Sequence, residues 1–560
     1  MSASILIIIG AAFLICGYIF YGRYIANKLG ISNENQTPAH IINDGIDYVP
    51  ARWQILLGHH FASIAGAAPI IGPITAAVFG WLPVFLWIVL GSIFAGAVHD
   101  FTSLIASIRH GGQSIGKVIE KQIGVQGKRL FLIFSWFTLI LVISAFTMLV
   151  AKTFVTNPEV GTSSSLFILL ALLFGVSIYR MKTHLGITTV VGVVLLFFCI
   201  WLGTKLPIIL PGGEIAAHQT WTGIILIYIF IASVTPVWIL LQPRDYLNSF
   251  LLYFVLIIGF IGIIVKNPSI EFPAFTRFID PKLGSMFPIL FVTVACGAIS
   301  GFHSLVASGT TAKQLNRESD ARPIGYGGML IEGVLAIIAL ITAVVLLPSR
   351  YGFFFPETGK ANPIALFANG IGGFVVKLGI PENVGITFAA MAVSAFALTS
   401  LDTATRLGRF AFQEFFRSPN PSKLGSFLTN RSVATSLTIL PAGILALSGS
   451  YQAIWPIFGS ANQLLAALAL LAGSVWIARK KEKNGFLRYP MFFMFAVTLS
   501  ALSILIYKKI LLITRFLLHG QVPETFSLTG TFFLLIIAIL LFVVAIVLVI
   551  ESFRSLKKYR

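Results

Sequence analysis

Apolar residues come in long runs along almost the whole chain, and short polar connections separate them. A run of about 20 apolar residues spans a hydrocarbon core of about 30 Å as a helix. Only a helix satisfies its own backbone hydrogen bonds within such a run, so the pattern predicts an all-α, polytopic transmembrane protein. We place about fifteen helices, at 4–22, 53–80, 81–108, 129–154, 164–181, 185–204, 221–243, 247–266, 287–311, 323–348, 383–405, 432–448, 456–477, 489–508 and 528–553.

Basic residues predict how these helices are oriented. The first run is followed, not preceded, by basic residues from Arg23 to Lys28, so we expect a retained helix rather than a cleaved signal peptide. With the N-terminus outside, alternate connections and the C-terminal tail hold most of the 39 Lys and Arg residues. This asymmetry favours an odd helix count, a cytoplasmic C-terminus and a location in the inner membrane. The pair Lys508 and Lys509 goes against this asymmetry, because it borders a connection that is expected outside.

Composition narrows the function classes. Hydrophobic residues make up 57% of the chain and charged residues only 11%, against about 25% charged in soluble domains. The net charge of +19 does not indicate nucleic acid, because Lys and Arg stand in short clusters between apolar runs. The sequence has no Walker loop, no Gly-x-Ser-x-Gly elbow and no His-Glu-x-x-His pattern. We therefore expect no enzyme activity, no cofactor and no metal site.

Two of the predicted helices carry proline and glycine in the middle. They are the second, between Ser63 and Pro73, and the seventh, between Ser233 and Pro243. Proline removes a backbone donor, and glycine lowers the cost of unwinding. Matched interrupted helices in two inverted halves are typical of a transporter site near the bilayer midplane, although simple kinks are the alternative for either helix alone. The substrate-binding residues predicted here are Gly66, Ala67, Pro69, Ser233, Pro236 and Trp238.

The ninth predicted helix has a third interruption, which contains His303. Ser300, Ser304 and Ser308 repeat there every four residues, which places them on one helix face. Their hydroxyl oxygens are candidates for binding a cation, and His303 with Ser304 for closing a substrate site. Small-residue packing between helices is the alternative explanation of the serines.

Few ionisable residues lie inside the apolar runs, and each is costly in lipid unless it faces a cavity or a partner. Glu332 is about ten residues into its helix, where a carboxyl group can carry a proton. His60 can relay protons because imidazole titrates near neutral pH. Asp100 and Asp402 lie toward the cytoplasmic ends of their helices, and Arg406 follows Asp402 by one turn, so a structural ion pair at the helix end is the alternative there. For any one histidine the alternative is a satisfied buried hydrogen bond. The predicted proton-coupling residues are His60, Asp100, Glu332 and Asp402.

Several long stretches make the chain similar to a known family. They are 58–73, 96–101, 236–246, 295–304, 308–311, 320–322, 324–329, 401–410 and 455–465. With these motifs the chain resembles the carbon starvation protein A family of transporters over roughly 50–475. The resemblance implies the fold of the amino acid–polyamine–organocation superfamily, with two inverted repeats of five helices. By that analogy 53–405 form the transport core, while 1–52 and 406–560 add peripheral helices.

The resemblance also implies a function, because members of the family import peptides, or pyruvate with protons, when carbon is scarce. We therefore expect a symporter that works by alternating access in the lipid bilayer and binds a small carboxylate. The outer connection at 349–382 is shorter than in some relatives, so a preference that depends on it does not transfer. Sodium coupling, a channel, and a sensor that signals to a partner kinase are the alternatives. The sequence leaves the substrate, the coupling ion and the oligomeric state open.

Overall fold

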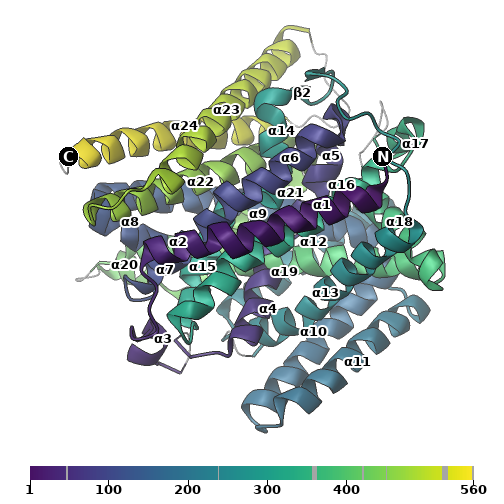
Figure 1. Cartoon of the computed structure of the whole chain (residues 1–560), viewed down its shortest axis with the longest axis horizontal. Coiled ribbons are helices and arrows are strands. Elements are labelled where there is room, and N and C mark those ends of the chain that lie inside the picture. Colours follow the sequence, from purple (N-terminus) through teal and green to yellow (C-terminus); the bar gives the residue numbers. More distant parts are fainter. Residues whose placement is uncertain are drawn as a thin grey trace.

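The structure is a computed structural model that describes residues 1–45, 48–236, 239–355, 362–418, 422–448, 451–519 and 528–557. Within these residues fourteen helices are long and apolar enough to cross a membrane, or fifteen if one bent pair is a single span. The predicted all-α membrane fold is therefore confirmed. The first helix begins and the last ends at opposite ends of the bundle (Figure 1), as an odd number of spans requires.

The helices of the first half of the chain are α1 (Ala3–Cys16), α2 (Gly22–Leu29), α3 (Pro38–Ile41), α4 (Trp53–Ile64), α5 (Ala68–Ala76), α6 (Trp81–Gly91), α7 (Ala97–Ile108), α8 (Ile115–Ile123), α9 (Val125–Thr156), α10 (Pro158–Tyr179), α11 (Leu185–Lys205), α12 (Gly213–Val234) and α13 (Leu241–Lys266). Short π-helical stretches, Gly17–Tyr21 and Ser92–Gly96, join α1 to α2 and α6 to α7.

The second half begins with a small antiparallel hairpin, β1 (Ile279–Asp280) and β2 (Gly284–Ser285). Its helices are α14 (Met286–Val294), α15 (Gly301–Gly309), α16 (Gly328–Val344), α17 (Pro348–Phe354), α18 (Pro363–Val375), α19 (Glu382–Phe416), α20 (Lys423–Leu428), α21 (Arg431–Ser448), α22 (Tyr451–Arg479), α23 (Gly485–His519) and α24 (Leu528–Lys557).

Two spans are broken at backbone level. Helices α4 and α5 meet at an angle of 47° across three residues that include Gly66, and Pro69 starts α5 in the first turn, where its missing N–H costs nothing. Helix α14 ends in a 3₁₀ turn, and Ala295 has a φ of 37°. Extended Ser300 then precedes α15. The interruptions predicted in the second and ninth helices are confirmed.

The broken spans cross in close contact because glycine lies at the crossing. A Cβ at Gly72 of α5 would be 2.5 Å from the carbonyl oxygen of Thr293 in α14. No side chain fits at this distance, so α5 and α14 approach backbone to backbone.

The interruption predicted inside the seventh helix, 221–243, is wrong in its position. Helix α12 already begins at Gly213 and runs unbroken to Val234, and α13 begins at Leu241. The residue before a proline favours extended backbone, and Thr235 before Pro236 has ψ 144°. Ser233 and Pro236 therefore lie at the end of one span and in the connection to the next.

The packing relates two sets of five spans to one another. Helices α9 and α19 pack along each other in the middle. Helix α13 packs on α4 and α19, as α22 packs on α15 and α9. Helices α12 and α21 each pack on both α9 and α19. Helix α16 packs on α5, and in the same way α7 packs on α15. This reciprocity is that of inverted repeats. Helices α10 and α11 stand outside it, packed on each other at the periphery (Figure 1).

A second glycine contact gives a stability test. A Cβ at Gly301 would lie 2.2 Å from the carbonyl oxygen of Asn462 and 2.5 Å from the amide nitrogen of Ala466. We expect Gly301→Ala to lower the free energy of unfolding by about 1–3 kcal/mol, because overpacking forces α15 and α22 apart. Thermal unfolding in detergent measures it. The matched control is Gly223→Ala, where no atom lies within 4 Å of the added Cβ. Equal melting temperatures for the two variants would contradict the expectation.

Candidate functional site

Four ionisable side chains meet beside the second break, and we call them the proton cluster: His99, Asp100, His303 and Glu332. Helix α7 supplies His99 and Asp100, α15 supplies His303 and α16 supplies Glu332. His303 Nδ1 lies 2.8 Å from Asp100 Oδ2, and His303 Nε2 lies 3.4 Å from Glu332 Oε2. His99 Nδ1 lies 2.7 Å from the other oxygen of Asp100. All four side chains are fully buried.

The imidazole of His303 bridges two carboxyl groups that come from different helices. Burying several charges together is costly, so a proton shared within the group stabilises it. Neither carboxyl oxygen of Glu332 has a hydrogen bond within the described part of the chain. The structure brings together three residues that the sequence singled out, Asp100, His303 and Glu332.

His60 belongs to α4, the first half of the first broken span, and lies near this cluster. Its Nδ1 is 2.8 Å from the hydroxyl of Thr311, and its other ring nitrogen has no partner among the described residues. The ring packs beside Gly328, one turn before Glu332. This contact places the ring of His60 beside α16, which carries Glu332.

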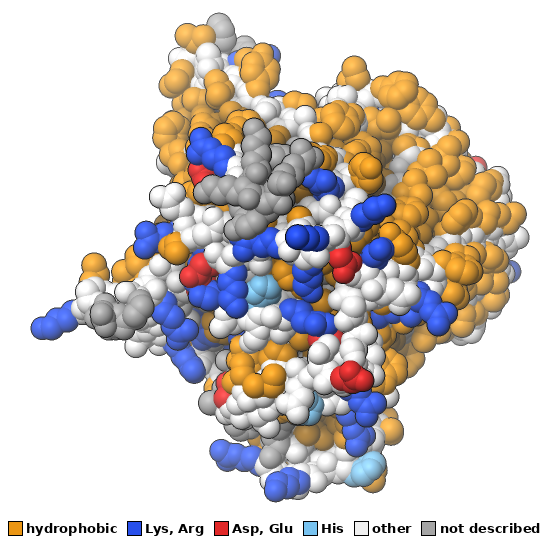
Figure 2. Space-filling view, turned by 60° about the vertical axis from the view of Figure 1, so that its left-hand side comes forward, with side chains coloured by type: hydrophobic (Ala, Val, Ile, Leu, Met, Phe, Trp, Pro, Cys, Tyr) orange, Lys and Arg blue, Asp and Glu red, His pale blue; other side chains and the backbone are white. Residues whose placement is uncertain are grey.

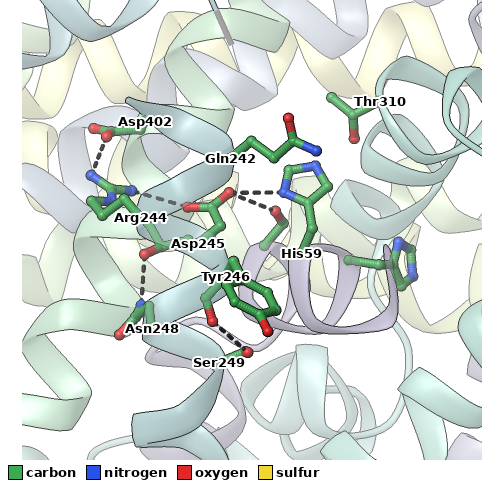
Figure 3. Close-up of polar contacts among 12 residues, drawn as sticks. His59, Gln242, Arg244, Asp245, Tyr246, Asn248, Ser249, Thr310 and Asp402 are labelled. Atoms are coloured by element: carbon green, nitrogen blue, oxygen red, sulfur yellow. Dashed lines mark hydrogen bonds and ion pairs between the residues drawn. The ribbon is translucent and has the colours of Figure 1, made fainter. Parts of the chain in front are cut away.

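A second group surrounds Arg244 at the start of α13, and we call it the arginine cluster: His59, Tyr228, Arg244, Asp245 and Asp402. Figure 3 shows how His59, Arg244, Asp245 and Asp402 lie in it. Arg244 donates hydrogen bonds to Asp402 and Tyr228 and lies 3.4 Å from Asp245. Asp245 contacts His59 Nδ1 at 3.2 Å. The cluster joins α4, α13 and α19 through buried charged or ionisable side chains, and it reaches α12 through the half-buried Tyr228.

The predicted ion pair between Asp402 and Arg406 is wrong, since Asp402 pairs with Arg244 instead. Arg406 donates to the carbonyl oxygens of Ala232 and Thr235 at the end of α12. Such carbonyls lack helical partners and carry negative partial charge, so an arginine satisfies them well.

The residues predicted to bind substrate fall into two places. Gly66 packs on Ser400 of α19, and a Cβ there would be 2.6 Å from the serine hydroxyl. Ala67 and Pro69 are buried next to it. The carbonyl oxygen of Ser233 accepts from Arg409, nine residues farther along α19, which is about 13 Å at 1.5 Å per residue. Pro236 follows Ser233 in the chain, and Trp238 lies outside the described residues.

The three serines do not share one helix face, because Ser300 precedes α15 in extended conformation. The hydroxyl groups of Ser304 and Ser308 donate to carbonyl oxygens of their own helix, at 2.7 and 2.6 Å. This is the geometry expected of serines in helix packing. A cation at these residues stays a prediction. In the described part of the chain no three His, Cys, Asp or Glu side chains are grouped to hold a metal ion.

Sequence reasoning missed two sets of residues. Arg244 and Asp245 were placed in a connection, because the predicted helix began at 247; an Arg-Asp pair beside an apolar run was the available signal. Asn462 of α22 was also missed. Its side-chain oxygen accepts from the backbone N–H of Phe302 at 2.8 Å, and its nitrogen donates to Ser300 at 3.0 Å. An amide from another span thus caps α15.

Comparisons with known proteins agree with this architecture. The family model described as "Carbon starvation protein CstA" matches residues 2–358 and 355–501. The chain is 34% identical over 523 residues to "Peptide transporter CstA" of Bacillus subtilis (strain 168), covering 87% of both chains. It is 32% identical over 569 residues to "Pyruvate/proton symporter BtsT" of Escherichia coli (strain K12), covering 86% of this chain and 78% of that protein.

A solved structure shares the fold. It is the crystal structure of a manganese transporter from Eremococcus coleocola in complex with an aromatic bis-isothiourea substituted compound, with a TM-score of 0.50. The alignment covers 92% of this chain and 99% of the transporter. At 14% sequence identity, this likeness concerns the fold alone.

Proposed function

Because the chain belongs to the carbon starvation protein CstA family, we propose that it imports a small carboxylate, a peptide or pyruvate, together with protons by alternating access. Relatives named as a peptide transporter and as a pyruvate/proton symporter support these two substrate classes. One observation carries the proposal: two broken helices cross in the bundle, and a buried cluster of two carboxyl groups and two imidazoles lies beside the second break.

We place the substrate between the break at 65–67 and the break at 295–300. The amides at the start of α5 and the positive end of its helix dipole suit a carboxylate. Gly66 lets the substrate approach the backbone, Ala67 and Pro69 form the turn, and His303 with Ser304 face the site from α15. Ser233 and Pro236, about 13 Å away along α19, belong on the route to the site rather than in it.

The proton cluster and His60 couple transport to the proton gradient in this scheme. His303 belongs both to the proposed substrate site and to the cluster, so protonation there changes the charge that a carboxylate meets. The arginine cluster holds Asp402 against Arg244, which gives this carboxyl a second role as a structural anion.

The transport core that we propose extends beyond 405 to Arg479. Its first repeat is α4–α5, α6–α7, α9, α12 and α13, and its second is α14–α15, α16, α19, α21 and α22. Helices α10 and α11 are an inserted pair, while α1–α2, α23 and α24 are peripheral. Lys and Arg gather on the end of the bundle that Figure 2 turns forward, which supports a cytoplasmic position for that end.

Uptake by purified protein in liposomes tests the function. An inward proton gradient is imposed, and radiolabelled pyruvate is compared with a neutral dipeptide. We expect saturable accumulation of one of them, which stops when a protonophore collapses the gradient and continues when sodium is replaced by choline. Binding without uptake would favour a sensor instead, and non-saturable flux without counterflow would favour a channel.

A further inference from the structure

A cavity of about 760 Å³ opens at the basic end of the bundle. Its walls come from α8, α9, the end of α15, the second half of α19 and the start of α21. No feature of the sequence had indicated it, because its lining comes from five segments spread over more than half the chain. The volume is that of a typical small-molecule site.

The lining is strongly positive. Among the described residues that line it, seven are basic and one, Glu414, is a carboxylate; the basic residues are Lys117, Lys128, Lys313, Arg406, Arg409, Arg417 and Arg431. Lys128 pairs with Glu414 at 3.2 Å. Glu120, just outside the lining, bonds to Lys117 and Lys128, and the hydrogen bond from Lys117 holds the pKa of Glu120 below its usual value. Among the described residues, the basic side chains of the lining therefore outnumber these two carboxylates.

The cavity reaches the broken helix that carries the proposed site. Leu305 and Ser308 of α15 line it, and they are two and five residues after His303. Ser135 of α9 also lines it, and its buried hydroxyl has no hydrogen-bond partner within the described residues. Arg417 and Arg431 are exposed at the mouth. A solute that moves from the proposed site beside α15 to the basic end of the bundle would therefore pass the basic side chains of this cavity.

We propose that this cavity is a second substrate subsite, which holds an anionic carboxylate on its way between the central site and the basic end. This inference rests on the proposed function and narrows the substrate class to small molecules with net negative charge. A monocarboxylate such as pyruvate meets this requirement, as does an acidic dipeptide, whereas a neutral zwitterionic dipeptide gains little from the positive field.

The test reverses charge at the mouth, with the double variant Arg417→Glu/Arg431→Glu. Transport of labelled pyruvate is measured in right-side-out and in inverted membrane vesicles, so that each face is sampled. We expect the KM at the basic face to rise about three-fold at 0.15 M salt and about ten-fold at 10 mM salt, because salt screens exposed charges. The KM for pyruvate at the opposite face changes less than two-fold.

The matched control is Lys423→Glu, an exposed residue in the same α19–α21 connection that does not line the cavity. An equal rise in KM with this control would overturn the proposal, since the effect would then come from the general surface potential. An unchanged KM at the basic face would overturn it too. If the wild-type protein transports neither pyruvate nor a dipeptide, the proposed function fails. The subsite is then tested by binding of pyruvate, and it is upheld if the double variant weakens this binding and Lys423→Glu does not.

Discussion

Replacing Arg244 with methionine destabilises the protein by about 3–5 kcal/mol, because it leaves buried carboxylates without their cation. Arg244 is fully buried and contacts both Asp402 and Asp245. It also donates to the hydroxyl of Tyr228, which itself donates to Asp402 at 2.7 Å. The loss is measured as a lower midpoint of thermal unfolding in detergent. Arg129→Met, at an exposed arginine of α9, is the control and leaves the midpoint unchanged.

A double variant distinguishes two causes of this destabilisation: the lost attraction between Arg244 and Asp402, and the buried carboxylate charge that is left without a partner. Arg244→Met/Asp402→Leu removes both members of the closest pair, so that Asp245, which keeps its contact with His59, is the one carboxylate of the three-residue contact that remains. We expect it to recover at least half of the stability that the single variant loses. A double variant that is as unstable as the sum of both single variants would show that the pair does not act as a unit.

Replacing Glu332 with glutamine removes accumulation against a gradient, by at least ten-fold, while exchange of labelled for unlabelled substrate continues. Glutamine has the size of glutamate and cannot carry a proton, so only the coupled step is lost. The measurement compares proton-driven uptake with counterflow in the same proteoliposomes. Glu271→Gln is the control, at an exposed glutamate before the hairpin. Full accumulation by Glu332→Gln would exclude this residue from coupling and leave Asp100 as the carboxyl to test.

The sequence was most informative where a single residue type has a strong local effect. Apolar runs predicted the spans, and Gly66 and Pro69 predicted the break between α4 and α5, since both act on their own backbone. The same reasoning failed at Pro236, because proline ends a helix as readily as it interrupts one. Only the packing of α12 and α13 as separate spans distinguishes the two outcomes.

The sequence predicted several residues of the site but not which of them contact one another. Asp100, His303 and Glu332 stood out because ionisable groups are costly in lipid. That His303 lies between the two carboxyl groups depends on the packing of α7, α15 and α16, which no local pattern encodes. Arg244 and Asp402 are 158 residues apart, so the nearby Arg406 was the partner that spacing suggested. Asn462 carries no charge and has no local signal for its capping role.

The cap that Asn462 provides has a consequence for how the two broken spans divide. Asn462 fastens α15 to α22, and the contact between His59 and Asp245 fastens α4 to α13. Helices α4 and α15, one half of each broken span, are thus each attached to a neighbouring helix. Helices α5 and α14, the other two halves, contact each other at Gly72. Separation of α4 from α15 would leave the contacts of Asn462 and His59 intact and would break the hydrogen bond between His60 and Thr311.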